Sequence, residues 1–131
     1  MGARGAMICL WVNKRDWLHP GPILTVGLQN AYSLAANGIK THLCCGVGEA
    51  SDTARELGEF YGLPPSENLT IHRLEARQWL IPGKGPGFYL QACALAKRLA
   101  AGDRVAVLTR DPGFLPYLWW LCRNRRIRGF Y

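Results

Sequence analysis

No apolar stretch in this chain comes close to the roughly 20 residues that a membrane-spanning helix needs. The start of the chain also lacks the features of a secretory signal, because the apolar run from Ala6 to Val12 is short and polar residues 13–16 follow it. A myristoylation signal would need Ser or Thr at position 6, which Ala6 occupies. We therefore expect a cytoplasmic protein.

Motifs for metals, disulfides and nucleotides are absent as well. The five cysteines are odd in number and form no C-x-x-C pair, so we expect buried thiols that pack as small hydrophobic groups, and no metal site. Cys44 and Cys45 are adjacent, and on a strand they would point to opposite faces. Neither a G-x-G-x-x-G fingerprint nor a Walker phosphate loop is present, and we expect no cofactor.

Acidic residues are scarce towards the end of the chain. The whole sequence carries 16 Lys and Arg against 9 Asp and Glu, a net charge of +7. Residues 41–80 contain three Arg and six acids, whereas residues 104–131 contain six Arg and one Asp. This distribution indicates a face that meets an anionic partner, although an ordinary solvated basic face would give the same pattern.

The amount of apolar sequence is that of a globular protein. Hydrophobic residues make up 49% of the 131 residues, and this length is typical of one domain, here residues 1–131. A chain of this size buries roughly 68% of its unfolded surface, so it can hold a core without disulfides or metals.

The segment from Pro22 to Gly46 organises the rest of the chain. It predicts a helix on which Gly27, Ala31 and Ala35 recur four apart, and such small residues let a helix lie close to a sheet. Gly38 stands where a left-handed residue would end that helix. Residues 39–45 then alternate between apolar and polar in the rhythm of a strand, apart from the paired cysteines.

Further strands and helices alternate along the chain. We expect strands at 6–12, 39–45, 69–74 and 105–108 and the start of another near 129, with helices at 52–61, 88–101 and 114–123 and a long loop at 13–22. This alternation predicts an α/β fold: a Rossmann-like, doubly wound parallel sheet between two layers of helices. Because the pattern stops with a strand, we expect the chain to be a piece of a longer protein.

Three phrases of the sequence are similar to one family. They are LAANGIKTHL at 34–43, VAVLTRD at 105–111 and GFY at 129–131. In their order and spacing they resemble the N-terminal domain of a GT-B-type glycosyltransferase of the retaining, family-four kind, whose corresponding phrases are close to "La..GheVhv", "vvytRd" and the start of "vyE.H". The resemblance covers essentially the whole chain.

The resemblance implies a division of labour between two Rossmann-like halves. The N-terminal half, matched here, mainly receives the acceptor, which would be a glycan or a lipid-linked glycan. The C-terminal half, absent from this sequence, binds the nucleotide-sugar donor, often with a pair of glutamates. The family's catalytic base, often a His, would lie beyond Tyr131. This chain by itself is therefore expected to be inactive, although its parent would be a hexosyltransferase.

Candidate substrate-binding residues follow two of the expected strands. Arg110 and Asp111 end the strand at 105–108, where Arg can grip a phosphate or carboxylate and Asp can accept from sugar hydroxyls. Asn13, Lys14 and His19 belong to the facing loop, and ligands of open parallel sheets bind beyond the carboxyl ends of the strands. The alternatives are a local surface pair for Arg110 and Asp111 and a solvated side chain for His19.

A non-enzymatic binding module is the competing interpretation. A Rossmann-like or flavodoxin-like layer with a basic face could bind an anionic partner without catalysis. Nucleic acid fits poorly as that partner, because no aromatic residues interleave with the Arg cluster at 123–128 and no binding motif is present.

The helix expected at 114–123 is apolar nearly all round. Trp119 and Trp120 are 100° apart on a helical wheel, so at least one should reach the surface near Arg123, Arg125 and Arg126. Trp beside Arg is typical of contact with the surface of an anionic membrane. Burial of both indoles under neighbouring chain or under the missing C-terminal half is the alternative.

Overall fold

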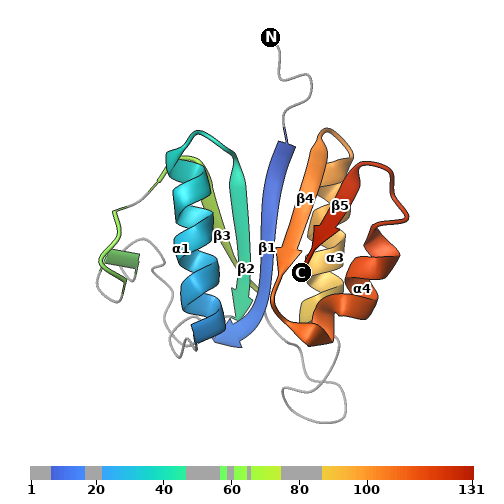
Figure 1. The fold of residues 1–131 in the computed structure, drawn as a ribbon, viewed down its shortest axis with the longest axis horizontal. Coiled ribbons are helices and arrows are strands. Elements are labelled where there is room, and N and C mark those ends of the chain that lie inside the picture. Colours follow the sequence, from blue (N-terminus) through green and yellow to red (C-terminus); the bar gives the residue numbers. More distant parts are fainter. Residues whose placement is uncertain (1–6, 17–21, 47–56, 59–60, 65, 75–86) are drawn as a thin grey trace.

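The computed structural model describes residues 7–16, 22–46, 57–58, 61–64, 66–74 and 87–131. Five strands and three α-helices lie in this part of the chain (Figure 1). In chain order they are β1 (Met7–Asp16), α1 (Pro22–Ala36), β2 (Thr41–Gly46), β3 (Leu69–Leu74), α3 (Gly87–Ala100), β4 (Arg104–Thr109), the 3-10 turn η1 (Pro112–Phe114), α4 (Leu115–Leu121) and β5 (Ile127–Phe130).

The five strands form one sheet in the order β3-β2-β1-β4-β5, and every neighbouring pair is parallel. The order runs outward in both directions from β1, which is the topology of a doubly wound α/β fold. Helix α1 covers one face of the sheet, and α3 and α4 cover the other (Figure 1). The predicted Rossmann-like, three-layer fold is therefore confirmed.

Small residues bring α1 close to the sheet, as predicted. Gly27, Ala31 and Ala35 are all buried. Gly38 has a φ of +86°, the left-handed conformation expected where the helix ends, and its N–H donates to the carbonyl of Ala35 at 3.0 Å. Gly62, the predicted stop of the helix at 52–61, also has a positive φ, of +67°, but most of that helix lies outside the described residues.

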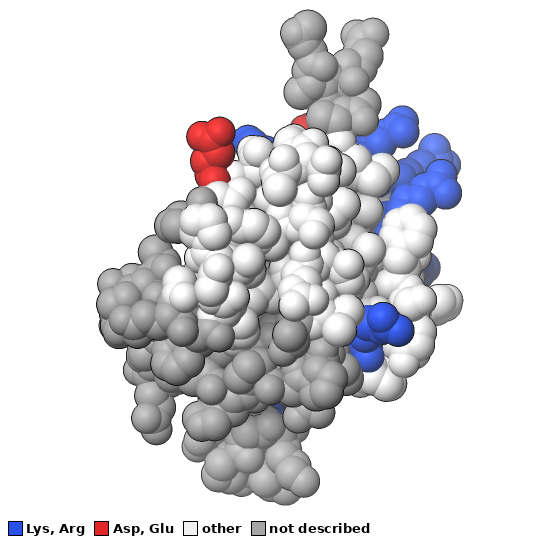
Figure 2. Space-filling view, turned by 60° about the vertical axis from the view of Figure 1, so that its left-hand side comes forward, with Lys and Arg blue, Asp and Glu red and all other residues white. Residues whose placement is uncertain are grey.

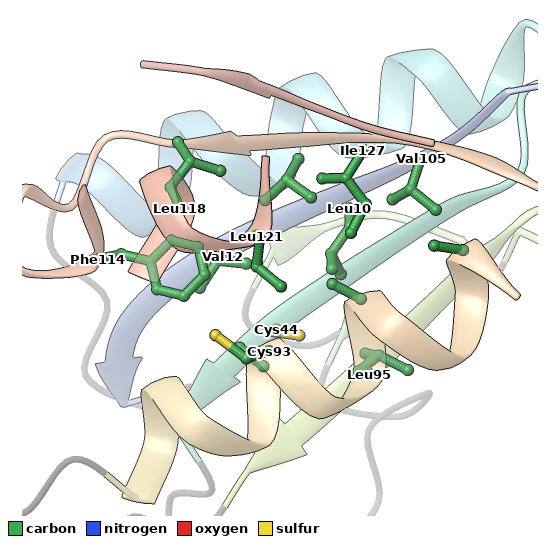
Figure 3. Packing of buried hydrophobic residues seen from close by; sticks show 14 of the residues in the cluster. Leu10, Val12, Cys44, Cys93, Leu95, Val105, Phe114, Leu118, Leu121 and Ile127 are labelled. Carbon is green, nitrogen blue, oxygen red and sulfur yellow. The ribbon is translucent and has the colours of Figure 1, made fainter. Parts of the chain in front are cut away.

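The core has two parts, one on each face of the sheet, and the adjacent cysteines divide between them. Cys44 packs with Leu10 and Val12 against α3 and α4, and Figure 3 shows these side chains facing the helices. Cys45 packs with Trp11 on the side of α1. The predicted strand alternation at this pair is confirmed, and both thiols are buried. Of the other described cysteines, Cys122 is exposed.

The largest difference from the sequence prediction is the length of β1. It continues through Asp16, where Asp16 pairs with Gly46 of β2 after an irregularity that follows Val12. Asn13 and Lys14 therefore lie on a strand, and the prediction of a loop from Asn13 was wrong. The extension depends on pairing with a strand 30 residues away along the chain, which no local pattern encodes.

The helix expected at 114–123 is also shorter than predicted. The chain makes a 3-10 turn over Pro112–Phe114 before the α-helix of Leu115–Leu121. Asp111 caps this turn, because its carboxylate accepts from the N–H of Gly113. An aspartate followed by proline favours such a start.

Candidate functional site

The carboxyl ends of β1 and β4 meet at the centre of the sheet. Val12 of β1 pairs with Thr109 of β4, and from this point the strand order runs outward on both sides. Helices α1 and α3 cover opposite faces here (Figure 1). Open α/β sheets bind their ligands in a crevice beyond the strand ends at such a switch point, and we use the word crevice for this region.

Thr109 ties the two strand ends together. Its buried hydroxyl donates to the carbonyl of Val12 at 2.7 Å and accepts from the backbone N–H of Asp111 at 3.0 Å. The same oxygen therefore fixes the end of β1 and the first turn after β4. This arrangement holds the segment that carries Arg110 and Asp111 in one place relative to Asn13 and Lys14.

Both oxygens of the Asp111 carboxylate have partners. Oδ1 accepts from the N–H of Gly113 at 2.9 Å, and Oδ2 accepts from the phenol of Tyr89 at 2.9 Å. Tyr89 lies in the first turn of α3, so this hydrogen bond joins α3 to the end of β4. The hydrogen bond orients the Asp111 carboxylate. It also engages an oxygen that could otherwise accept a hydrogen bond from a ligand.

The pKa of Tyr89 is raised well above its ordinary value. Burial is the largest cause, and the hydrogen bond to Asp111, its negative charge and the nearby Tyr117 add to it. The phenol therefore stays protonated and keeps donating at every physiological pH. Tyr89 and Tyr117 also stack, with ring centroids 5.1 Å apart.

Lys14 and Arg110 supply positive charge at the crevice. The ammonium of Lys14 lies 5.2 Å from the centroid of the Tyr89 ring, a cation–π distance. Arg110 follows β4 directly and is exposed. Tyr89 thus connects two residues predicted from different parts of the sequence, Lys14 through its ring and Asp111 through its hydroxyl.

Asn13 is fully buried, and both polar atoms of its amide lack a hydrogen-bond partner. It faces Gly27 of α1, where a Cβ would overlap its Nδ2 atom. An unpaired buried amide costs about 1–3 kcal/mol, so a natural chain rarely keeps one without a use for it. Asn13 follows the last residue of β1 that pairs with β4, so its unpaired amide lies near the switch point, on the side of α1.

The other predicted residues fall into two groups. His19 lies outside the described residues. Trp119, Trp120, Arg123, Arg125 and Arg126 are all exposed on α4 and the turn that follows it, and they are not part of the crevice. Both indoles reach the surface, so the alternative that neighbouring parts of this chain bury them is wrong for the described structure.

Tyr89 is the site residue that sequence reasoning missed. Its place on the apolar stripe of α3 predicts a core residue, and half of that prediction is correct, since its ring packs at 5.7 Å from the ring of Phe114. The signal that could have found it is the polar hydroxyl in the first turn of a helix that follows a glycine-rich stretch.

No group of three or more metal-ligating side chains occurs in the described part of the chain. None of its helices is both long and apolar enough to cross a membrane. Protein-family models, curated proteins and solved structures give no match to this chain.

Proposed function

We propose that this chain is the acceptor-side domain of a GT-B glycosyltransferase of the retaining, family-four kind. The parent enzyme would transfer a sugar from a nucleotide-sugar donor to a glycan or lipid-linked acceptor. The donor would bind mainly to a second Rossmann-like half, so this domain needs no cofactor of its own.

The positions of the three family-like phrases support the proposal. The phrase at 34–43 covers the end of α1, Gly38 and the start of β2. The phrase at 105–111 covers β4 and the two residues after it, and the phrase at 129–131 covers the end of β5. Each phrase thus falls on a sheet strand or a turn leading into one, as the fold of that half requires.

The observation that carries the proposal is that two cations lie beside the switch point, Lys14 over the ring of Tyr89 and Arg110 exposed directly after β4. Asn13 precedes Lys14 on β1, and its buried amide faces Gly27 of α1, so it supports this region from inside the fold. Lys14 and Arg110 suit a phosphate or carboxylate on the acceptor. Asp111, with both oxygens already engaged, orients the segment after β4.

A non-enzymatic binding module is the second candidate. The observation that favours it is the number of exposed arginines away from the crevice, at 123, 125, 126 and 128. Such a module would bind an anionic partner at this basic surface, and the crevice would then serve only stability.

The same proposal places the protein in the cytoplasm with a peripheral position on a membrane. A lipid-linked acceptor would require that position, and the exposed Trp119 and Trp120 are compatible with it.

Sugar transfer tests the proposal. The protein is expressed in its natural length and incubated with a panel of nucleotide sugars and of glycan and lipid-linked acceptors. We expect transfer that falls about tenfold or more on Arg110→Ala, the loss expected for one charged hydrogen bond. Arg104→Ala is the matched control, because Arg104 is an exposed arginine at the opposite end of β4.

Two results would contradict the transferase proposal. One is the absence of transfer with every donor, together with binding of an anionic partner, which favours the module. The other is equal activity of the Arg110→Ala and Arg104→Ala variants, which would remove Arg110 from the site.

A further inference from the structure

Helix α4 turns its two tryptophans away from the core. Leu118 and Leu121 are buried against the sheet, whereas Trp119 is 72% exposed and Trp120 is 44% exposed. Leu115, one turn before Trp119, is exposed as well. The outer face of this helix therefore presents apolar surface to solvent, which is costly unless something covers it.

Positive charge adjoins this apolar face. From residue 112 to residue 131 the sequence has four arginines and no acidic residue. All four arginines are exposed, in the turn after α4 and on β5. We call the combined set the basic-aromatic surface; it consists of Trp119, Trp120, Arg123, Arg125, Arg126 and Arg128.

Among the other described cations, Arg98 lies in the last turn of α3, where positive charge stabilises a helix end without any ligand. In Figure 2 the visible Lys and Arg side chains lie mostly along the right-hand side, and few charged side chains appear among the described residues of the front. On this face of the molecule the positive charge of the described residues is thus unevenly placed.

Two hollows open at the turn between α4 and β5. The first, of about 290 Å³, is lined in part by Lys97, Trp120 and Arg123. The second, of about 450 Å³, is lined in part by Arg125 and Arg128. Each hollow combines two cations, so each suits the phosphate of a headgroup better than a neutral molecule.

Lipid fits this surface better than nucleic acid does. Single-stranded nucleic acid would stack its bases on exposed aromatic rings, but the ammonium of Lys97 already lies 4.1 Å from the centroid of the Trp120 ring. Trp119 is exposed one turn after the aliphatic Leu115, and Phe130 and Tyr131 are exposed as well. An indole and aliphatic side chains beside arginines suit the boundary between headgroups and acyl chains.

We propose that the basic-aromatic surface binds the surface of a bilayer that contains anionic phospholipid. The Trp119 indole enters the headgroup region, and the arginines contact lipid phosphates. The contact stays at the surface, since no described helix could cross the bilayer. These residues would hold the protein at the membrane surface whether or not it transfers sugar.

The surface also has a fixed relation to the crevice. Helix α4 begins at Leu115, directly after the 3-10 turn that Asp111 caps. Its outer face therefore extends from the edge of the crevice towards the basic turn at 122–126. A protein held to a bilayer by this face would keep the crevice beside the membrane surface.

Cosedimentation with vesicles tests the inference. Vesicles of phosphatidylcholine alone, or with 30–40% phosphatidylglycerol, are mixed with the protein at low and high salt. We expect binding that requires phosphatidylglycerol and falls as salt rises. Replacing Arg123, Arg125 and Arg126 together by Gln should weaken binding about fivefold for each charge removed.

Single substitutions test whether the Trp119 indole itself contributes to vesicle binding, or whether any exposed apolar side chain would do so. Trp119→Ala should weaken binding about tenfold and abolish the part of the blue shift in tryptophan emission that its indole contributes. Leu90→Ala is the matched control, because Leu90 is 51% exposed on α3, away from this surface. Lys40→Gln is the charge control, since Lys40 is exposed before β2. Both controls should bind like the original protein.

The inference fails if the protein stays in the supernatant with phosphatidylglycerol vesicles at low salt. Equal binding to neutral vesicles would also overturn it, as would equal losses for the test and control variants. RNA binding is measured by fluorescence polarisation with a labelled single strand of 20 nucleotides. Tight RNA binding without vesicle binding would assign the surface to nucleic acid. Circular dichroism of each variant checks that it is folded.

Discussion

Nδ1 of His42 and Nε2 of His72 lie 2.8 Å apart across strands β2 and β3. The two ring centroids are 5.1 Å apart, and the ring planes differ by 19°. One nitrogen must donate and the other must accept, so each imidazole keeps one proton in the neutral pair. The pair is half-buried on the sheet, and the charges of Lys40 and Arg98 act on it.

We predict that the protein loses stability as pH falls from about 6.5 to about 4. Burial, the charge of His42 and the charge of Arg98 lower the pKa of His72 from 6.5 to about 4, and burial and Lys40 lower the pKa of His42. The unfolded chain therefore takes up protons before the folded chain does, so the loss begins near pH 6.5 and is complete below the folded pKa. Urea unfolding midpoints at stepped pH measure it.

The His42→Gln and His72→Gln variants should each flatten this pH dependence. His19→Gln is the control, because His19 is the remaining histidine of the sequence. A midpoint that falls equally steeply in all four proteins would assign the loss to other groups.

Gly38→Val should destabilise the protein by about 1 kcal/mol or more. A side chain at a φ of +86° is strained, and a β-branched one more so. Gly102→Val is the comparison, because a Cβ added at Gly102 would meet open space and Gly102 has no positive φ. The urea unfolding midpoints of the two variants measure their stability. A similar loss of stability at both positions would show that the left-handed conformation of Gly38 is not the cause.

Gly27→Ala should destabilise the protein by about 1–3 kcal/mol, because the new Cβ would overlap the amide of Asn13. Asn13→Ala should be near neutral or stabilising, since it removes a buried amide that has no partner. The double variant should recover most of the loss. Thermal unfolding of the three variants measures the stability changes. If the change in the double variant equals the sum of the two single changes, the contact between residues 13 and 27 is contradicted.

Tyr89→Phe should destabilise the protein by about 1.5–3 kcal/mol, the usual range for a hydrogen bond to a charged group. Tyr117→Phe is the matched control, because Tyr117 keeps its ring stacked on Tyr89 and no hydrogen bond from its hydroxyl to Asp111 is involved. Equal unfolding free energies for the two variants would mean that the Tyr89 hydroxyl contributes nothing.

Local patterns were enough to predict the fold. The spacing of Gly27, Ala31 and Ala35 and the glycine at 38 follow from short stretches of sequence, as does the division of Cys44 and Cys45 between the two faces. The alternation of strands and helices along the chain then leaves few topologies, because parallel strands need covered faces.

The site was only partly predictable, for a physical reason. That Asn13, Lys14 and Arg110 lie at the same edge of the sheet follows from the rule that parallel strands end at one edge. The hydrogen bonds at this edge could not be predicted, because they join residues far apart in the sequence. Tyr89 and Asp111 are 22 residues apart, and Thr109 and Val12 are 97 residues apart. Register between distant strands fixes such contacts, as it does for His42 and His72.

The central claim is that the crevice between β1 and β4 receives the acceptor. The most direct measurement is a titration of the isotope-labelled protein with a soluble glycosyl phosphate, such as glucose 1-phosphate, followed by NMR. We predict shift changes at the amides of Asn13, Lys14, Arg110 and Gly113, and affinity about tenfold weaker in Arg110→Gln but unchanged in Arg104→Gln. Shifts confined to α4 and β5, or no shifts up to the solubility limit, would contradict the claim.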